Sequence, residues 1–126
     1  MGRRFRSESS YSKYLSENPE RMAQLAAHLI AKDGLLLAEL EGAIIGMIGW
    51  ILHSHFISGE WVAGEVFWWM EPEHRGHGLK LLDAVKQSAR ARGAKYLHMI
   101  APSERIERLY RHLGYEFVES TWQVGL

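Results

Sequence analysis

The sequence predicts one domain of mixed α/β architecture, from its length and from the order in which its hydrophobic patterns change. With 126 residues the chain is long enough for one hydrophobic core and too short for two. Apolar residues recur first at helical spacing, then at the short period of strands, and then in alternating segments of both kinds. The predicted order is helix, three strands, helix, strand, helix and strand, which is typical of a sheet covered by helices.

The N-terminal part of the chain predicts a polar arm and a helix. Residues 1–17 are polar and mixed, and we expect a partly ordered arm or a short helix there. Asn18 is a suitable N-cap and Pro19 a suitable first residue for a helix that ends before Gly34.

The middle of the chain predicts a hairpin and a third strand. The short apolar period and the "EG" turn indicate strands 35–40 and 43–56. Gly46 and Gly49 within the second strand indicate a bulge or the close approach of another backbone. The turn "SGE" leads into a third, tryptophan-rich strand at 61–70.

The C-terminal part predicts two helices and two further strand segments. A helix from Leu79 to Arg92 carries one apolar face and ends at Gly93. "KYLHMIA" is expected to be a strand, and "SERIERLYRHL" a short helix that begins at Ser103. "YEFVESTWQVGL" is expected to form a closing strand or hairpin.

The composition excludes several classes of function. Fifteen basic and fifteen acidic side chains cancel, whereas nucleic-acid-binding domains usually carry a basic excess. The chain has no cysteine, which excludes thiol nucleophiles and zinc–thiolate sites and fits a reducing compartment. No apolar run approaches the roughly 20 residues of a membrane-spanning helix. We therefore expect a cytoplasmic protein that binds neither nucleic acid nor membrane.

The stretch "EPEHRGHGLK", residues 71–80, joins the third strand to the following helix. A glycine-rich turn at a helix start directs backbone N–H groups at one point, where the helix dipole favours an anion. Arg75 and Lys80 add positive charge, and an arginine can bind a phosphate through two hydrogen bonds. On these residues alone an anion site and an ordinary polar turn are equally supported.

Two segments resemble the GNAT superfamily of N-acyltransferases. "WWMEPEHRGHGLKLLDAVKQSARARGAKYLHM" is similar to its acetyl-CoA signature, in which a strand, a proline and Arg/Gln-x-x-Gly-x-Gly/Ala precede a helix. "SERIERLYRHLGYEF" is similar to its C-terminal Asn-x-x-Ala-x-x-x-Tyr-x-x-x-Gly-Phe segment, and "LLLAELEGAIIGMIGW" to its hairpin. The resemblance covers residues 18–126. It implies a short acetyl-CoA-dependent N-acetyltransferase with an α/β (α+β) fold, whose mixed, largely antiparallel central sheet is flanked by helices on both faces.

The resemblance also implies where acetyl-CoA, the cosubstrate, would bind. The end of the third strand, at Trp69 and Met70, would hydrogen-bond the pantetheine arm as an added strand would. Ser103 stands where the family often has asparagine. The pyrophosphate would be held by Arg75, Gly76, His77, Gly78, Leu79 and Lys80.

One position departs from the family signature. If Gly78 is the last glycine of the signature, the following helix is in family phase, but Glu73 occupies the arginine or glutamine position. Keeping Arg75 in that position shortens the loop by two residues. We favour the shorter loop, because a glutamate facing a pyrophosphate would be repelled.

The resemblance assigns Tyr110 the role of the family tyrosine that protonates the departing thiolate, which requires a donor within hydrogen-bond reach. Tyr110 also fits a helix aromatic residue that packs on the sheet. Direct attack by an amine requires a base, for which Glu65 is the first candidate and His53 or His55 the next. Glu65 equally fits a solvated or salt-bridged strand residue.

Other classes of function remain open. Four histidines raise the possibility of a metal site, but no further side chain completes a ligand spacing, so we expect no metal. A catalytically weak or inactive GNAT-like module that binds acyl-CoA, or acts through interactions, is the alternative to an enzyme. We find no convincing first strand, and an uncovered sheet edge with tryptophan-rich strands suggests a homodimer. The loop near residues 54–60 fits a small amine, an amino acid or a peptide N-terminus as acceptor.

Overall fold

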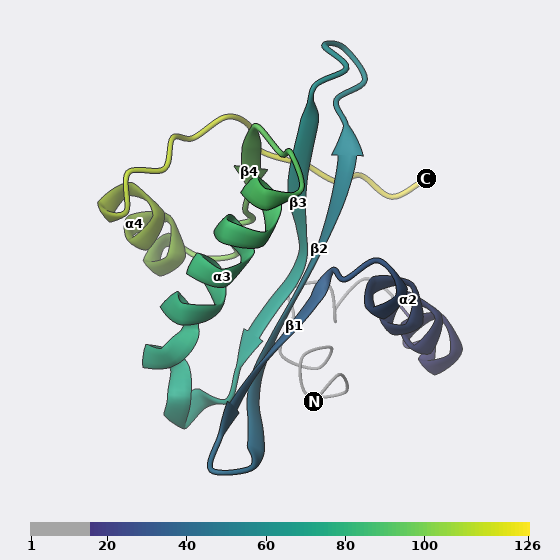
Figure 1. The fold of residues 1–126 in the computed structure, drawn as a ribbon. Helices are drawn as coiled ribbons and strands as arrows, with labels where there is room; N and C mark the ends of the chain where they lie inside the picture. Colours follow the sequence, from purple (N-terminus) through teal and green to yellow (C-terminus); the bar gives the residue numbers. More distant parts are fainter. Residues whose placement is uncertain (1–15) are drawn as a thin grey trace.

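The computed structural model describes residues 16–126, which form a four-stranded sheet between helices (Figure 1). Residues 1–15, most of the expected N-terminal arm, lie outside the described part. The elements are α2 (Pro19–Ala31), β1 (Leu35–Leu40), β2 (Ala43–Ser54), β3 (Trp61–Met70), the 3-10 helix η2 (Pro72–His77), α3 (Gly78–Ala91), β4 (Tyr96–His98) and α4 (Glu104–His112). None of these helices is long and apolar enough to cross a membrane.

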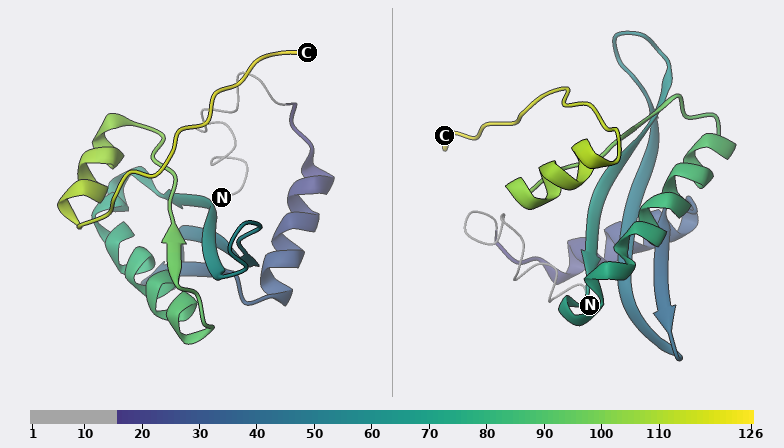
Figure 2. Two further views of the ribbon diagram at one scale, coloured as in Figure 1. Left: turned by 90° about the horizontal axis from the view of Figure 1, so that it is seen from above. Right: turned by 90° about the vertical axis from the view of Figure 1, so that its left-hand side faces the viewer.

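The sheet has the strand order β1-β2-β3-β4. β1, β2 and β3 are antiparallel neighbours, and β4 runs parallel to β3. α2 covers one face and α3 the other (Figure 2). The predicted mixed, largely antiparallel sheet with helices on both faces is therefore confirmed.

The two faces are packed differently. The α3 face holds the main core, in which Ile48, Trp50 and Ala63 of the sheet pack with Val85 and Ala89 of α3. On the α2 face, Leu29 is fully buried. A Cβ at Gly49 would lie 2.8 Å from the side chains of Leu29 and Phe67, so only glycine lets the helix and this strand approach so closely. These contacts are with side chains and not with another backbone, whereas the register shift between Gly49 and Trp50 agrees with the predicted alternative, a bulge.

A bulge in β3 decides which residues face α3. Gly49 of β2 lies opposite Phe67 and Trp50 lies opposite Glu65, so Val66 is an extra residue in β3. Side chains alternate between faces along a strand, and the extra residue shifts this alternation by one position. Glu65 before the bulge and Trp68 after it therefore lie on the same face of the sheet, the α3 face.

Two strand boundaries and one predicted strand differ from the sequence-based expectation. The second hairpin strand ends at Ser54 rather than at residue 56, and β4 spans three residues rather than the whole of "KYLHMIA". The closing strand or hairpin predicted for residues 115–126 is wrong, because no helix or strand follows α4. This tail crosses from the α4 side toward the α2 side of the sheet instead of running along β4 (Figure 2). Apolar patterning favours a strand, but a strand forms only where its backbone finds a partner.

Candidate active site

β3 and β4 stay paired for only three residues and then separate. The pairs are Val62 with Tyr96, Ala63 with Leu97 and Gly64 with His98. Beyond them β3 continues to Met70, while the chain after β4 turns toward α4. We call the region bordered by residues 65–70 of β3, residues 99–103 and α4 the seam.

Two side chains meet at Ile100 in the seam. The backbone N–H of Ile100 donates to Oε1 of Glu65 over 3.2 Å. The hydroxyl of Tyr110 donates to the carbonyl oxygen of Ile100 over 2.9 Å. If the parallel pairing of β3 and β4 continued, backbone groups such as these would hydrogen-bond to the neighbouring strand instead. Glu65 and Tyr110, the two residues predicted to be catalytic, thus both hydrogen-bond the backbone of Ile100.

Glu65 lies in an environment that suits a proton acceptor. Burial raises the pKa of its carboxyl group to about 7, and the hydrogen bond from the N–H of Ile100 partly opposes that rise. Within residues 16–126 no cation pairs with it, so the salt-bridge alternative is not what the described structure contains. A carboxyl group that ionises near neutral pH has the property required of a general base.

Tyr110 lies in the last turn of α4 and is 7% exposed. Burial raises the pKa of its phenol above the ordinary value, and the negative charge of Glu65 adds to the rise. The phenol therefore keeps its proton at neutral pH and can act as a donor. Tyr110 also packs as an aromatic residue against the sheet, so both sequence-based interpretations describe part of its environment.

The two histidines considered as alternative bases do not lie in the seam. His53 lies opposite Val62 on the other face of the sheet from Glu65. Nδ1 of His55 accepts hydrogen bonds from the backbone N–H groups of Ile57, at 3.2 Å, and Ser58, at 3.4 Å. His55 therefore stabilises the turn between β2 and β3.

The predicted pyrophosphate turn lies at the start of α3. Gly78 is the first residue of α3, whose N-cap His77 makes no side-chain capping bond and whose first turn has no acidic residue. Arg75 lies in the last turn of η2, just before it. A Cβ at Gly78 would come within 3.1 Å of Cζ2 of Trp68, whereas one at Gly76 would meet nothing within 4 Å. Glycine thus lets α3 start against Trp68 and leaves the turn open.

The remaining predicted cofactor residues are placed as follows. Leu79 and Lys80 continue the first turn of α3. Trp69 and Met70 end β3 opposite Met47 and Gly46 and are 6% and 5% exposed. Ser103 is the N-cap of α4, as predicted, and its hydroxyl oxygen accepts from the N–H of Ile106 over 3.3 Å. Its oxygen therefore has a structural partner, and its contact with a cofactor stays a prediction.

Sequence reasoning missed two aromatic residues beside Tyr110. Trp68 and Tyr115 both stack on Tyr110, with ring centroids 6.5 Å and 5.3 Å away. Nε1 of Trp68 and the hydroxyl of Tyr115 are buried without a hydrogen-bond partner in the described chain. Large aromatics usually indicate core, which is why the sequence did not single them out. Unpaired buried donors are uncommon in native proteins, so each of these two calls for an explanation.

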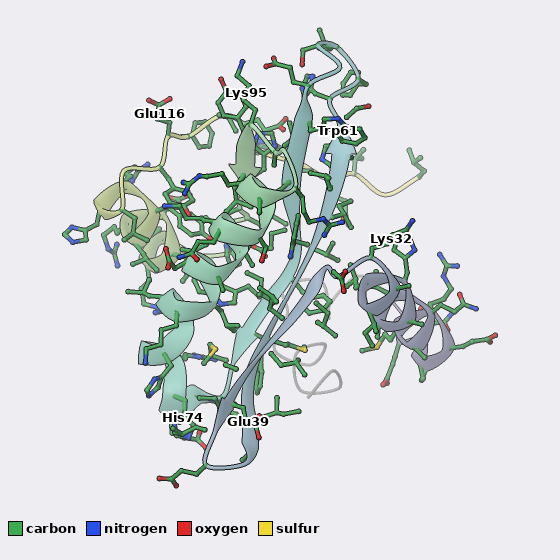
Figure 3. The ribbon with its side chains drawn as sticks, viewed as in Figure 1. Lys32, Glu39, Trp61, His74, Lys95 and Glu116 are labelled. Carbon is green, nitrogen blue, oxygen red and sulfur yellow. The ribbon has the colours of Figure 1, made fainter. Side chains whose placement is uncertain are left out.

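A shallow cavity of about 420 Å³ lies at the other end of β3. In Figure 3 this end of β3 lies near the labels of Trp61 and Lys95, and the predicted pyrophosphate turn lies near the label of His74 at the opposite end. Glu60 in its wall forms an ion pair with Lys95. The full lining is His55, Ser58, Glu60, Val62, Tyr96, His98, Val118 and Glu119. Within residues 16–126 no three histidine or acidic side chains gather as metal ligands here or elsewhere.

The sequence of residues 3–115 matches the profile of the Acetyltransferase (GNAT) family. The chain belongs to this family. No curated protein matches the sequence. Membership supports an acyltransferase at family level and, with it, the use of acetyl-CoA.

Several solved structures that share this fold are acetyltransferases. AAC(6')-Iy, in complex with the bisubstrate analogue CoA-S-monomethyl-acetylneamine, has a TM-score of 0.72, 17% identity and coverage of 92% of this chain and 85% of its own. The ribosomal-protein-alanine N-acetyltransferase of Brucella melitensis biovar Abortus has a TM-score of 0.66, 21% identity and coverage of 93% and 86%. A transcriptional regulator from Bacillus halodurans has a TM-score of 0.76, 16% identity and coverage of 98% and 89%. At these identities the likeness shows the GNAT fold alone.

Proposed function

We propose that this GNAT chain is an N-acetyltransferase that transfers the acetyl group of acetyl-CoA to a primary amine of a small molecule or peptide. The observation that carries the proposal is the meeting of Glu65 and Tyr110 at the two backbone groups of Ile100. A carboxyl group with a pKa of about 7 and a protonated phenol suit a reaction that deprotonates an amine and protonates a thiolate.

The cosubstrate would extend from the start of α3 along the end of β3 to Tyr110. Backbone N–H groups at the start of α3 and the positive end of its dipole favour the pyrophosphate, and Arg75 and Lys80 add charge. β4 pairs with residues 62–64 of β3, and the end of β3, at Trp69 and Met70, would lie along the pantetheine arm. This arrangement would direct the thioester toward Tyr110.

The proposed reaction is direct attack. The amine nitrogen forms a new bond to the carbonyl carbon of the thioester, and the carbon–sulfur bond breaks. Glu65 takes the proton that the amine loses, and Tyr110 gives its proton to the departing sulfur. No nucleophile of the protein takes part, which is consistent with a chain without cysteine.

The two proton transfers are coupled. The negative charge of Glu65 is one cause of the raised pKa of Tyr110. When Glu65 accepts the proton of the amine, this charge disappears and the pKa of Tyr110 falls. The base step therefore makes Tyr110 a stronger acid for the step that follows.

A panel of small amines, amino acids and peptides, assayed for acetyl-CoA consumption, tests the proposal. We expect turnover with at least one amine and its near loss in Tyr110→Phe. Thermal unfolding with acetyl-CoA provides the companion measurement, since ligand at 100 times its Kd stabilises by about 2.7 kcal/mol. Stabilisation without turnover of any amine would support the alternative, a catalytically weak acyl-CoA-binding module. No stabilisation would refute both.

Homodimerisation and a cytoplasmic location, also expected from the sequence, stay predictions. The mass of the protein in solution tests the first.

A further inference from the structure

Trp68 connects the two ends of the proposed CoA site. Its Cζ2 lies so close to Gly78, the first residue of α3, that a Cβ there would come within 3.1 Å. Its ring centroid is 6.5 Å from that of Tyr110. An arm that joins a phosphate at the start of α3 to a thioester beside Tyr110 must therefore pass along Trp68.

Two polar atoms in the aromatic rings that stack on Tyr110 have no partner in the described chain. Nε1 of Trp68 and the hydroxyl of Tyr115 are buried and make no hydrogen bond within the described residues. Both rings stack on Tyr110, so the two orphaned donors flank the proposed acid. Burying a donor without a partner destabilises a fold. Two such donors at one place indicate that their partner is supplied by a ligand.

An orphaned donor is not sufficient evidence by itself. The indole N–H of Trp50 is also buried and unpaired in the described chain. Trp50, however, packs in the core of the sheet, with the guanidinium of Arg92 4.9 Å above its ring. Position separates the two cases, because Trp68 and Tyr115 stack on Tyr110, whereas Trp50 belongs to the core cluster.

We propose that the indole N–H of Trp68 and the hydroxyl of Tyr115 donate hydrogen bonds to the amide carbonyls of the pantetheine arm of bound acyl-CoA. The inference rests on the proposed function and adds side-chain donors to the backbone contacts of that site. A pantetheine arm carries amide carbonyls, which are acceptors, and it is otherwise flexible. Two fixed donors would therefore hold the arm in the orientation that brings its sulfur to Tyr110.

Tyr115→Phe is the cleanest test, because it removes one oxygen and keeps the ring. We expect its Kd for CoA, measured by calorimetric titration, to rise about five- to tenfold, the effect of one lost hydrogen bond. We expect the melting temperature of the ligand-free variant to stay unchanged or to rise, since an unpaired buried hydroxyl has gone. A residue with a purely structural role would leave the Kd unchanged.

Trp68 needs a replacement that preserves its packing. Benzothienylalanine at position 68 exchanges the N–H for sulfur and keeps the shape of the ring, whereas Trp68→Phe also removes volume. We expect the benzothienyl variant to weaken CoA binding by a similar factor. Tyr96→Phe is the matched control, because this tyrosine is 57% exposed on β4 outside the seam, and its Kd for CoA should not change.

The outcomes separate this inference from the proposed function. If the unmodified protein binds CoA and both variants keep its Kd, the inference is overturned and the proposed function stands. Wild-type affinity in one variant alone removes that residue from the proposed contacts. If the unmodified protein does not bind CoA, the proposed function itself fails.

Discussion

The two halves of β3 use one strand in two different ways. From Val62 to Gly64 the strand is paired with β2 on one side and β4 on the other, and Val62 and Ala63 are 2% and 0% exposed. From Glu65 to Met70 it has left β4, and the side chains along it include a carboxyl group with a raised pKa and an unpaired indole N–H. The first half satisfies its polar groups within the chain, and the second half leaves some of them unsatisfied.

This difference suggests that the half of β3 paired with β4 serves stability and that the half beyond it serves function. Unpaired donors and a buried carboxylate lower the stability of the ligand-free protein, and such local costs are expected at functional sites. Substitutions in the paired half should therefore change folding. Substitutions around the seam should change binding or turnover, and some of them should make the protein more stable.

The largest effect is expected from Tyr110→Phe. Losing a positioned general acid should lower kcat by roughly 100-fold or more, while CoA still binds. Steady-state kinetics with an active amine, together with calorimetric titration of CoA, measure the two effects separately. Turnover that stays unchanged across the pH range would remove Tyr110 from the acid role. Tyr96→Phe is the matched control for the loss of a phenol.

Glu65→Gln should lower activity and raise stability. Burial raises the pKa of Glu65 from its ordinary value of 4.5 to about 7 in the folded protein, which therefore binds this proton more tightly than the unfolded chain does. The stability from this group is therefore fully present below about pH 4.5 and is lost as the pH rises through about 7. The loss amounts to about 3 kcal/mol, which glutamine avoids because it carries no charge.

Two measurements check this prediction. Thermal unfolding at pH 5 and pH 8 should show Glu65→Gln to be several degrees more stable than the wild type at pH 8 and nearly equal at pH 5. The rate of the wild type should fall as the pH drops below about 7, since the base becomes protonated. A variant that is less stable than the wild type at pH 8 would contradict the assignment of Glu65 as a buried carboxylate without an ion-pair partner.

Ala63→Leu tests the paired half of β3. Ala63 is fully buried in the core on the α3 face, so a larger side chain should destabilise the fold by about 1–3 kcal/mol through overpacking. Denaturant unfolding measures this loss. The kcat of the folded fraction should stay within about twofold of the wild type. A large drop in kcat at unchanged stability would mean that the two halves are not separable.

The smallest effect is expected from Ser103→Ala. The variant loses the N-cap of α4 and should be destabilised by about 1 kcal/mol. Ser103→Asp restores a capping oxygen and serves as the control. If Ser103 also contacts the cofactor, as the family resemblance implies, the alanine variant should bind CoA more weakly as well. An unchanged Kd would limit Ser103 to its capping role.

Local features of the fold were predictable because their causes are local. Oδ1 of Asn18 accepts from the N–H of Arg21 over 3.0 Å, as expected of an N-cap. The "EG" turn carries Glu41 and Gly42 at φ values of 51° and 80°, which glycine adopts at little cost. The tail after α4 was mispredicted, because its strand pattern required a partner edge that only the assembled sheet could supply.

The candidate site was predictable in its main residues and not in its arrangement. The sequence by itself determined where helices start and stop, which strands join by a tight turn and, through a family motif, that Tyr110 and the start of α3 belong to one site. Only the tertiary structure decided that Glu65 and Tyr110 both bond to Ile100, which is 35 residues from Glu65 and 10 residues from Tyr110 in the sequence. It also placed Trp68 and Tyr115 beside Tyr110. These contacts depend on the bulge at Val66 and on where β4 leaves β3, and both arise from packing between distant segments.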